Sequence, residues 1–167
     1  MKKIFLLILA PMLLLASCTS VDNDNLPSYA VNLDLGTYAM WNTYGVTGVG
    51  DYKIFNRPKQ LPKNFPYNAN IYTGYGGILL IMGLDITTGS YAPVAYDAAC
   101  PNCRKADTMV SIETTNYEAV CPTCDSHFNV LTGSGGPVSG KAFERKIGMT
   151  LYKVRASANG GYVVSSR

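Results

Sequence analysis

Four cysteines carry the strongest chemical signal in this 167-residue chain. They form two pairs of matched spacing, Cys100-Pro101-Asn102-Cys103 and Cys121-Pro122-Thr123-Cys124, and residues 104–120 separate the pairs. A Cys-x-x-Cys turn places both sulfurs on one side of a tight loop, and two facing loops form the tetrahedral thiolate site that zinc or iron takes. We therefore predict that Cys100, Cys103, Cys121 and Cys124 bind one metal ion or cluster.

The same four cysteines could instead close two disulfides, which an oxidising compartment would favour. A disulfide within Cys-x-x-Cys is strained, and proteins that contain one commonly use it for thiol–disulfide exchange. Two dithiols with proline at the same position fit a metal site better. Thiol–disulfide exchange stays open as an alternative to metal binding.

Residues 1–17 have the layout of an export signal, with Lys2 and Lys3 before an apolar stretch too short to span a bilayer. This segment ends in Leu15-Ala16-Ser17-Cys18, which resembles the lipobox of bacterial lipoproteins. The resemblance implies that the signal is removed and that Cys18 is acylated, with palmitate or a similar fatty acid. We expect a membrane-anchored protein, with residues 18–27 as a solvated tether. Thr19 replaces the Asp that retains some lipoproteins at the inner membrane, which favours the outer membrane.

Composition limits the class of protein. Without Lys2 and Lys3 the chain has twelve basic and eleven acidic residues, so it is nearly neutral and we expect no nucleic-acid partner. Twelve Tyr, sixteen Gly and nine Pro between short apolar stretches predict strands and turns. We expect one all-β domain over residues 28–167, with a metal-binding lobe at about residues 98–140.

Strands must position the cysteine loops. Alternation of apolar and polar residues at 31–35 predicts a first strand with one wet face. Prolines among residues 41–72 indicate a long irregular excursion, and no helical periodicity is visible. The continuous apolar run at 78–82 predicts a strand buried on both faces, and the next strand, with Val94 and Tyr96, leads to the first cysteine pair.

Two hairpins are expected after the first cysteine pair. Residues 109–113 and 117–121 flank a turn sequence, and pairing centred near Thr115 sets Met109 opposite Cys121 and residue 106 level with Cys124. This pairing brings both cysteine loops to the same open end. Near the carboxyl terminus, alternating residues 147–151 precede a turn at 158–161 and a strand at 162–164. The whole pattern predicts antiparallel β structure.

The second cysteine pair is similar to the second cluster-binding loop of Rieske iron–sulfur proteins. The similar segments are Cys121-Pro122-Thr123-Cys124-Asp125-Ser126-His127-Phe128, Gly133 and Gly136-Pro137-Val138-Ser139-Gly140. Residues 95–101 are similar to the approach to the family's first loop, so the resemblance covers about residues 95–142. It implies an antiparallel base, built from both ends of the chain, that carries a small inserted metal-binding lobe.

The chain departs from the Rieske pattern at the ligands. A Rieske cluster uses two cysteines and two histidines, but His127 is the only histidine. Carried over by position, Cys100 and Cys121 match the family's cysteines, Asn102 and Cys124 stand at the histidine positions, and Cys103 follows Asn102. We therefore expect no two-histidine cluster. Four thiolates would hold zinc, a mononuclear iron or a low-potential [2Fe–2S] cluster, and we favour zinc.

The predicted function is that of a non-enzymatic envelope lipoprotein in which structural zinc holds the lobe together. The alternative is an electron-transfer protein that carries iron on the same cysteines and serves an unidentified redox partner. No set of residues for hydrolysis or group transfer is visible in the sequence. His127 is expected to be a loop residue, and Arg104, Lys105 and Lys141 either offset thiolate charge or lie on the surface.

Overall fold

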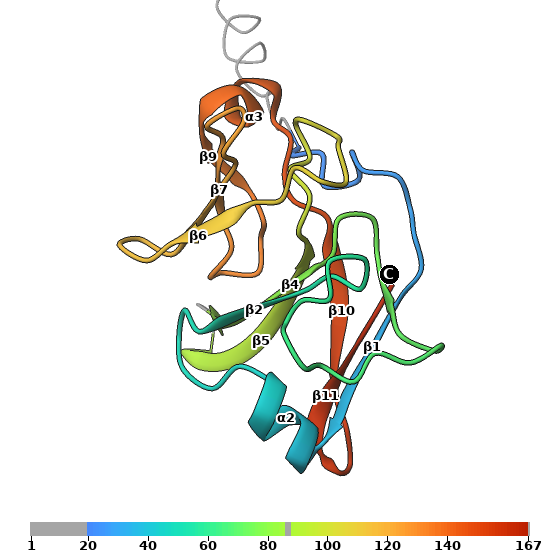
Figure 1. The fold of residues 1–167 in the computed structure, drawn as a ribbon. Helices are drawn as coiled ribbons and strands as arrows, with labels where there is room; N and C mark the ends of the chain where they lie inside the picture. The colour runs from blue at the N-terminus through green and yellow to red at the C-terminus, as the bar shows by residue number, and fades with distance from the viewer. Residues whose placement is uncertain (1–19, 86–87, 167) are drawn as a thin grey trace, which may run out of the picture.

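The computed structural model describes residues 20–85 and 88–166, which fold into two sheets (Figure 1). Cys18 and the expected export signal lie outside the described residues. The predicted all-β class is confirmed, because strands dominate and the helices in the described ranges are short. Within the same ranges, no helix has the length and apolar character needed to cross a bilayer.

The larger sheet has seven strands and curves into a nearly closed barrel. Every neighbouring pair of strands is antiparallel, and both ends of the described chain meet in the sheet, where Leu33 pairs with Val164. In spatial order the strands are β2 (Tyr52–Phe55), β4 (Ile78–Asp85), β5 (Ser90–Asp97), β10 (Leu151–Ala156), β11 (Gly160–Ser165), β1 (Val31–Thr37) and β3 (Tyr72–Thr73).

A small lobe is inserted between β5 and β10, which are themselves paired in the barrel. Its four short strands are β6 (Ser111–Glu113), β7 (Glu118–Val120), β8 (His127–Asn129) and β9 (Pro137–Ser139), and the helix α3 (Gly140–Arg145) follows directly. Figure 1 shows α3 at the opposite end of the molecule from the helix α2 (Tyr38–Tyr44). The chain thus leaves the barrel for the lobe after β5 and returns to it at the adjacent strand β10.

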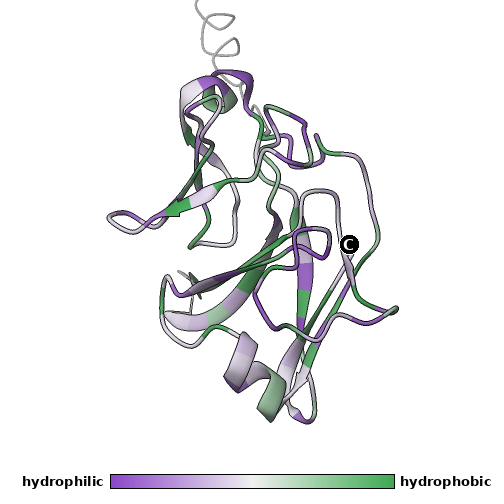
Figure 2. Ribbon diagram, in the orientation of Figure 1, coloured by the Kyte–Doolittle hydropathy of each residue, from purple (hydrophilic) through white to green (hydrophobic). Residues whose placement is uncertain are grey.

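Strand β4 separates two hydrophobic cores. Ile78, Leu80 and Met82 pack in the barrel core, whereas Leu79 and Ile81 belong to a second core shared with the lobe. The predicted strand that is buried on both faces is therefore confirmed. Strand β1 exposes one face, with buried and exposed residues in alternation, and Figure 2 shows polar and apolar residues alternating along β10.

Asp97 fixes the point at which the chain leaves the barrel for the lobe. Its buried carboxylate accepts hydrogen bonds from the hydroxyl of Tyr152 and from the backbone N–H groups of Tyr75, Gly76 and Ala99, the last at 2.8 Å. Burial raises the pKa of Asp97, and these hydrogen bonds oppose the shift. A Cβ on Gly76 would lie 2.4 Å from that of Ala99, so glycine is required for this close approach.

The structure corrects the expected lack of regular structure in residues 41–72. Helix α2 begins after Thr37, whose side chain accepts a hydrogen bond from the N–H of Met40, and β2 and β3 also lie in or at the edge of this range. A helix of seven residues completes only about two turns, so it leaves no visible periodicity in the sequence. The terminal hairpin forms, although its first strand begins at Leu151 and not at Ile147.

The described part of the predicted tether is attached to the lobe. Asp22 forms a bridge with Ile147, and the side chain of Asn25 donates a hydrogen bond to the carbonyl of Pro101 at 2.8 Å. Leu26 is buried. Residues 22–26 therefore lie along the domain and are not a freely solvated linker.

Candidate metal centre

Each cysteine pair occupies the tip of a hairpin. An isolated bridge joins Ala99 to Met109 below the first pair, and Val120 pairs with His127 below the second. The backbone N–H of Cys100 also donates to the carbonyl of Thr108. Antiparallel pairing on both sides of a short loop holds its ends together, so each hairpin fixes one loop.

The two cysteine loops share one backbone geometry. The N–H of Arg104 donates to the carbonyl of Cys100, and the N–H of Asp125 donates to the carbonyl of Cys121, both at 3.0 Å. Arg104 and Asp125 have φ angles of 54° and 52°, in the left-handed region. This conformation costs a non-glycine residue on the order of 1 kcal/mol. Its occurrence at equivalent positions shows that both loops close in the same way.

The loops bring the four predicted ligands together. Sγ of Cys100 lies 3.6 Å from Sγ of Cys124, Sγ of Cys103 lies 3.7 Å from Sγ of Cys121, and all four sulfurs lie within 4.8 Å of one another. A tetrahedral ion with metal–sulfur bonds of about 2.3 Å separates its ligands by about 3.8 Å. A disulfide bond would be far shorter, and all four cysteines are free. The arrangement is compatible with a four-thiolate metal site.

The hairpin between the two loops differs by one residue from the predicted register. Ser111 pairs with Val120, so Met109 is not opposite Cys121. The turn contains four residues, 114–117, and Tyr117 adopts a left-handed conformation with φ of 56°. Sequence alone gave no signal for a left-handed tyrosine, which is why the shorter turn was expected.

Burial divides the ligands into two kinds. Cys100 and Cys121 are 0% and 1% exposed and belong to the second hydrophobic core, together with Val110 and Phe128. The remaining two cysteines, Cys103 and Cys124, are partly exposed. The site therefore has an inner edge in the apolar core and an outer edge near solvent.

Three of the ligand thiols, those of Cys100, Cys103 and Cys124, differ in how readily they ionise. Burial raises the pKa of Cys100 and raises that of Cys103 to about 11, and neighbouring cysteine sulfurs add to both shifts. The pKa of Cys124 is lowered to about 6. Burial acts to raise it, but hydrogen bonds from Ser126 and Asn102 outweigh the effect of burial. Metals bind thiolates and displace protons, so metal affinity at such a site increases with pH.

Ser126 connects the second cysteine loop to helix α3, a contact that the sequence does not predict. Its hydroxyl oxygen is buried, lies 3.2 Å from Sγ of Cys124 and accepts a hydrogen bond from the N–H of Ala142 at 3.0 Å. Ser139, the N-cap residue of α3, makes no side-chain cap bond. Ser126 thus caps α3 from the metal loop, and its O–H can donate to the ionised sulfur of Cys124.

His127 lies outside the group of four sulfurs. Its Nδ1 is 2.9 Å from Oε2 of Glu118, and its Nε2 is 3.7 Å from Oδ1 of Asp125. The structure places it in β8 and not in a loop. The basic residues considered as charge partners for the thiolates, Arg104, Lys105 and Lys141, are exposed on the surface.

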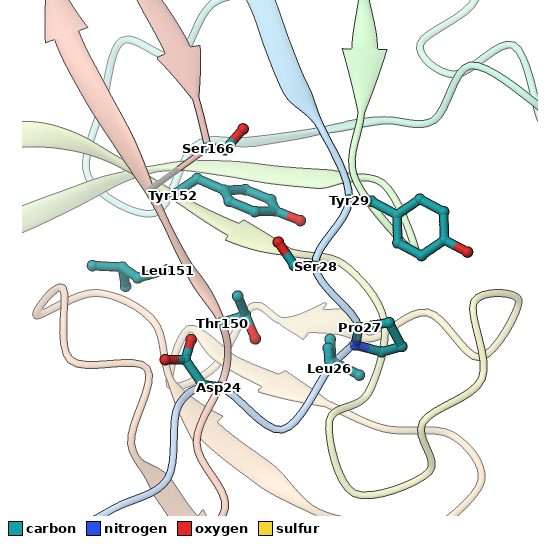
Figure 3. A pocket seen from close by; sticks show the side chains of 9 residues that line it. All are labelled: Asp24, Leu26, Pro27, Ser28, Tyr29, Thr150, Leu151, Tyr152 and Ser166. Atoms are coloured by element: carbon teal, nitrogen blue, oxygen red, sulfur yellow. The ribbon is translucent and has the colours of Figure 1, made fainter.

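A surface cavity of about 370 Å³ lies apart from the cysteines, between the N-terminal segment and β10 (Figure 3). Residues 26–29 and 150–152 provide most of its lining, and Asp24 is the single acidic side chain in it. The lining contains no cysteine, histidine or second carboxylate.

No family model matches the chain, and a search of curated proteins found no significant match. The functional argument therefore depends on the geometry of the site.

We expect Ser126→Ala to lower the free energy of unfolding by about 1–3 kcal/mol, because the buried N–H of Ala142 loses its acceptor. Metal affinity should fall by roughly 10–100-fold, since Cys124 loses a hydrogen bond. Chemical denaturation and competition with a chelator would measure the two effects. Ser139→Ala is the control, because Ser139 makes no cap bond, and it should change stability by less than about 0.5 kcal/mol. Equal effects of the two substitutions would contradict this role of Ser126.

Proposed function

We propose that this protein is a lipid-anchored envelope protein whose domain is stabilised by a structural zinc ion on Cys100, Cys103, Cys121 and Cys124. The observation that carries the proposal is the approach of the four sulfurs to within 4.8 Å of one another. The proposed role of the site is to join the two hairpins of the lobe, and the protein is not an enzyme.

The ligand set supports a structural role over a catalytic one. Four thiolates fill the coordination sphere of tetrahedral zinc, whereas a catalytic zinc keeps an open position for water or substrate. The ligands come from two separate hairpins, so one ion would fix their relative position. In such sites the free energy of metal binding contributes directly to folding.

The spacing of the sulfurs supports one ion over a two-iron cluster. In a [2Fe–2S] cluster held by four cysteines, two sulfurs bind each iron, and the iron–iron axis separates the two pairs. The distance between sulfurs on different irons must therefore exceed the sulfur–sulfur distance around a single tetrahedral ion. Here the contacts of 3.6 Å and 3.7 Å join different loops, and no pair of the four exceeds 4.8 Å.

The second candidate function is electron transfer by iron on the same four sulfurs. The partial exposure of Cys103 and Cys124 supports it, because an exposed sulfur edge gives a redox partner access to the metal. Zinc is favoured because four thiolates suit it and because it needs no dedicated assembly before export.

We also propose that the domain is Rieske-like, with cysteines in place of the histidine ligands. Two features support this relationship. The barrel pairs strands from both ends of the described chain, and a single insertion between β5 and β10 carries both cysteine loops. Cys124 stands where the family has its second histidine, which accounts for the change of ligand chemistry.

The proposed anchor is an acylated Cys18, and its support is the lipobox-like sequence Leu15-Ala16-Ser17-Cys18. Several acyl chains on one residue give stable membrane attachment, whereas one chain binds only marginally. The outer membrane is favoured over the inner because Thr19, and not Asp, follows the cysteine.

Metal analysis of the chain purified without air, from its own host, tests the proposed site. We expect colourless protein with one zinc per chain, because the four thiolates hold one ion. Iron with a visible absorption spectrum would establish the electron-transfer alternative. Metal-free protein with two disulfides would contradict both functions and favour thiol–disulfide exchange.

We expect Cys121→Ser to destabilise the domain by about 4 kcal/mol or more, because loss of a ligand removes metal-binding free energy from folding. Thermal unfolding of the metal-loaded protein measures the effect. Thr123→Ala is the matched control, since Thr123 is an exposed residue of the same loop. A melting temperature for Cys121→Ser that equals that of the control would show that the site is not structural.

A further inference from the structure

Residues 22–25, at the start of the described chain, are hydrogen-bonded to the metal-binding lobe. The N–H of Asp22 donates to the carbonyl of Lys146, and the N–H of Gly148 donates to the carbonyl of Asp22, both at 2.8 Å. Asn25 reaches the first cysteine loop through its bond to the carbonyl of Pro101. Cys18 is four residues before Asp22, a span of at most about 14 Å of extended chain. A lipid on Cys18 would therefore enter the bilayer close to the end of α3.

The surface of the lobe around α3 combines exposed apolar and basic side chains. Helix α3 buries only Ala142, and Phe143 is 58% exposed. Val21 and Val138, at 43% and 42% exposed, add apolar surface in the flanking segments. The basic residues of the helix and its C-cap are exposed too, and they are Lys141, Arg145 and Lys146. Exposed aromatic and basic residues together are typical of surfaces that contact lipid headgroups.

We propose that this α3 surface, formed by Val21, Val138, Lys141, Phe143, Arg145 and Lys146, lies on the bilayer to which Cys18 is anchored. Phe143 inserts among the headgroups, and the three basic side chains contact lipid phosphates. The inference deepens the proposed function and depends on its lipid anchor. Glu144 and Asp22 are acidic and partly offset the basic charge of this surface, so charge alone is a weak argument. The main support for the orientation is the short span from Cys18 to Asp22.

This orientation places the metal centre at the membrane surface. The start of α3 packs on the second cysteine loop, where a Cβ on Gly140 would lie 2.3 Å from the carbonyl oxygen of Asp125. The end of α3 reaches the first loop, where Arg145 donates to the side chain of Asn102 at 3.2 Å. Both loops therefore contact the helix that faces the membrane in this proposal, while α2 lies at the opposite end of the molecule (Figure 1).

Tryptophan quenching by lipid tests this orientation in the full lipidated protein. Trp41, in α2, is the only tryptophan, so a Trp41→Phe background allows Phe143→Trp to report from α3. Tyr38→Trp in the same background is the matched control, because Tyr38 is 71% exposed and lies in α2. The proteins are reconstituted in vesicles of phosphatidylcholine and phosphatidylglycerol, with brominated chains as quenchers. Flotation of the vesicles reports anchoring independently of orientation, and Cys18→Ser provides the unanchored reference.

We expect all lipidated variants to float with the vesicles and brominated lipid to remove roughly half of the emission of the Phe143→Trp variant, because an interfacial residue lies within reach of the acyl chains. The Tyr38→Trp variant should keep its emission. Flotation without quenching at Phe143→Trp overturns the orientation and leaves the anchor intact. Emission that is unquenched by lipid but shielded from iodide indicates that a second copy of this chain covers α3, which also overturns it. Failure to float overturns the anchor, and the orientation with it.

Discussion

Four cysteine sulfurs within 4.8 Å of one another form a stable arrangement of thiolates only when a cation lies between them. Ionised thiols at this distance repel, and Cys100 lies in an apolar core that disfavours its charged form. A metal bound there would reverse both effects, because it would neutralise the thiolates and join the two hairpins. The proposed ion would therefore stabilise the lobe more directly than the seven-stranded barrel.

The barrel and the lobe hold this site through a few buried polar contacts. Asp97 fixes the exit of the chain from β5 by accepting four hydrogen-bond donors, three of them backbone amides. Ser126 connects the second cysteine loop to α3. Leu79 and Ile81 on one face of strand β4 pack in the core that is shared with the lobe. The other face of β4 packs in the barrel core. The two cysteine loops thus lie between the barrel and helix α3.

The features that could be predicted from the sequence are those that short patterns encode. The spacing of the cysteines predicted their convergence, and the apolar run at residues 78–82 predicted a strand buried on both faces; both are seen in the structure. Acylation of Cys18 and the Rieske relationship remain predictions. The zinc ion and the absence of catalysis also remain predictions.

Other features depend on contacts between residues distant in the sequence or on rare backbone conformations. The hydrogen bond from the N–H of Ala142 to the hydroxyl of Ser126 spans sixteen residues, and no local pattern marks it. Helices α2 and α3 are too short to show a period. The register between the cysteine loops depends on the left-handed conformation of Tyr117, and the attachment of residues 22–26 depends on partners such as Ile147.

X-ray absorption at the metal edge of the native protein tests the central claim most directly, because it counts the ligands around the ion and detects a neighbouring metal. The account predicts four sulfur ligands at about 2.3 Å from a single zinc ion and no metal–metal scattering. Nitrogen or oxygen ligands in place of sulfur, or scattering from a second metal, would contradict it.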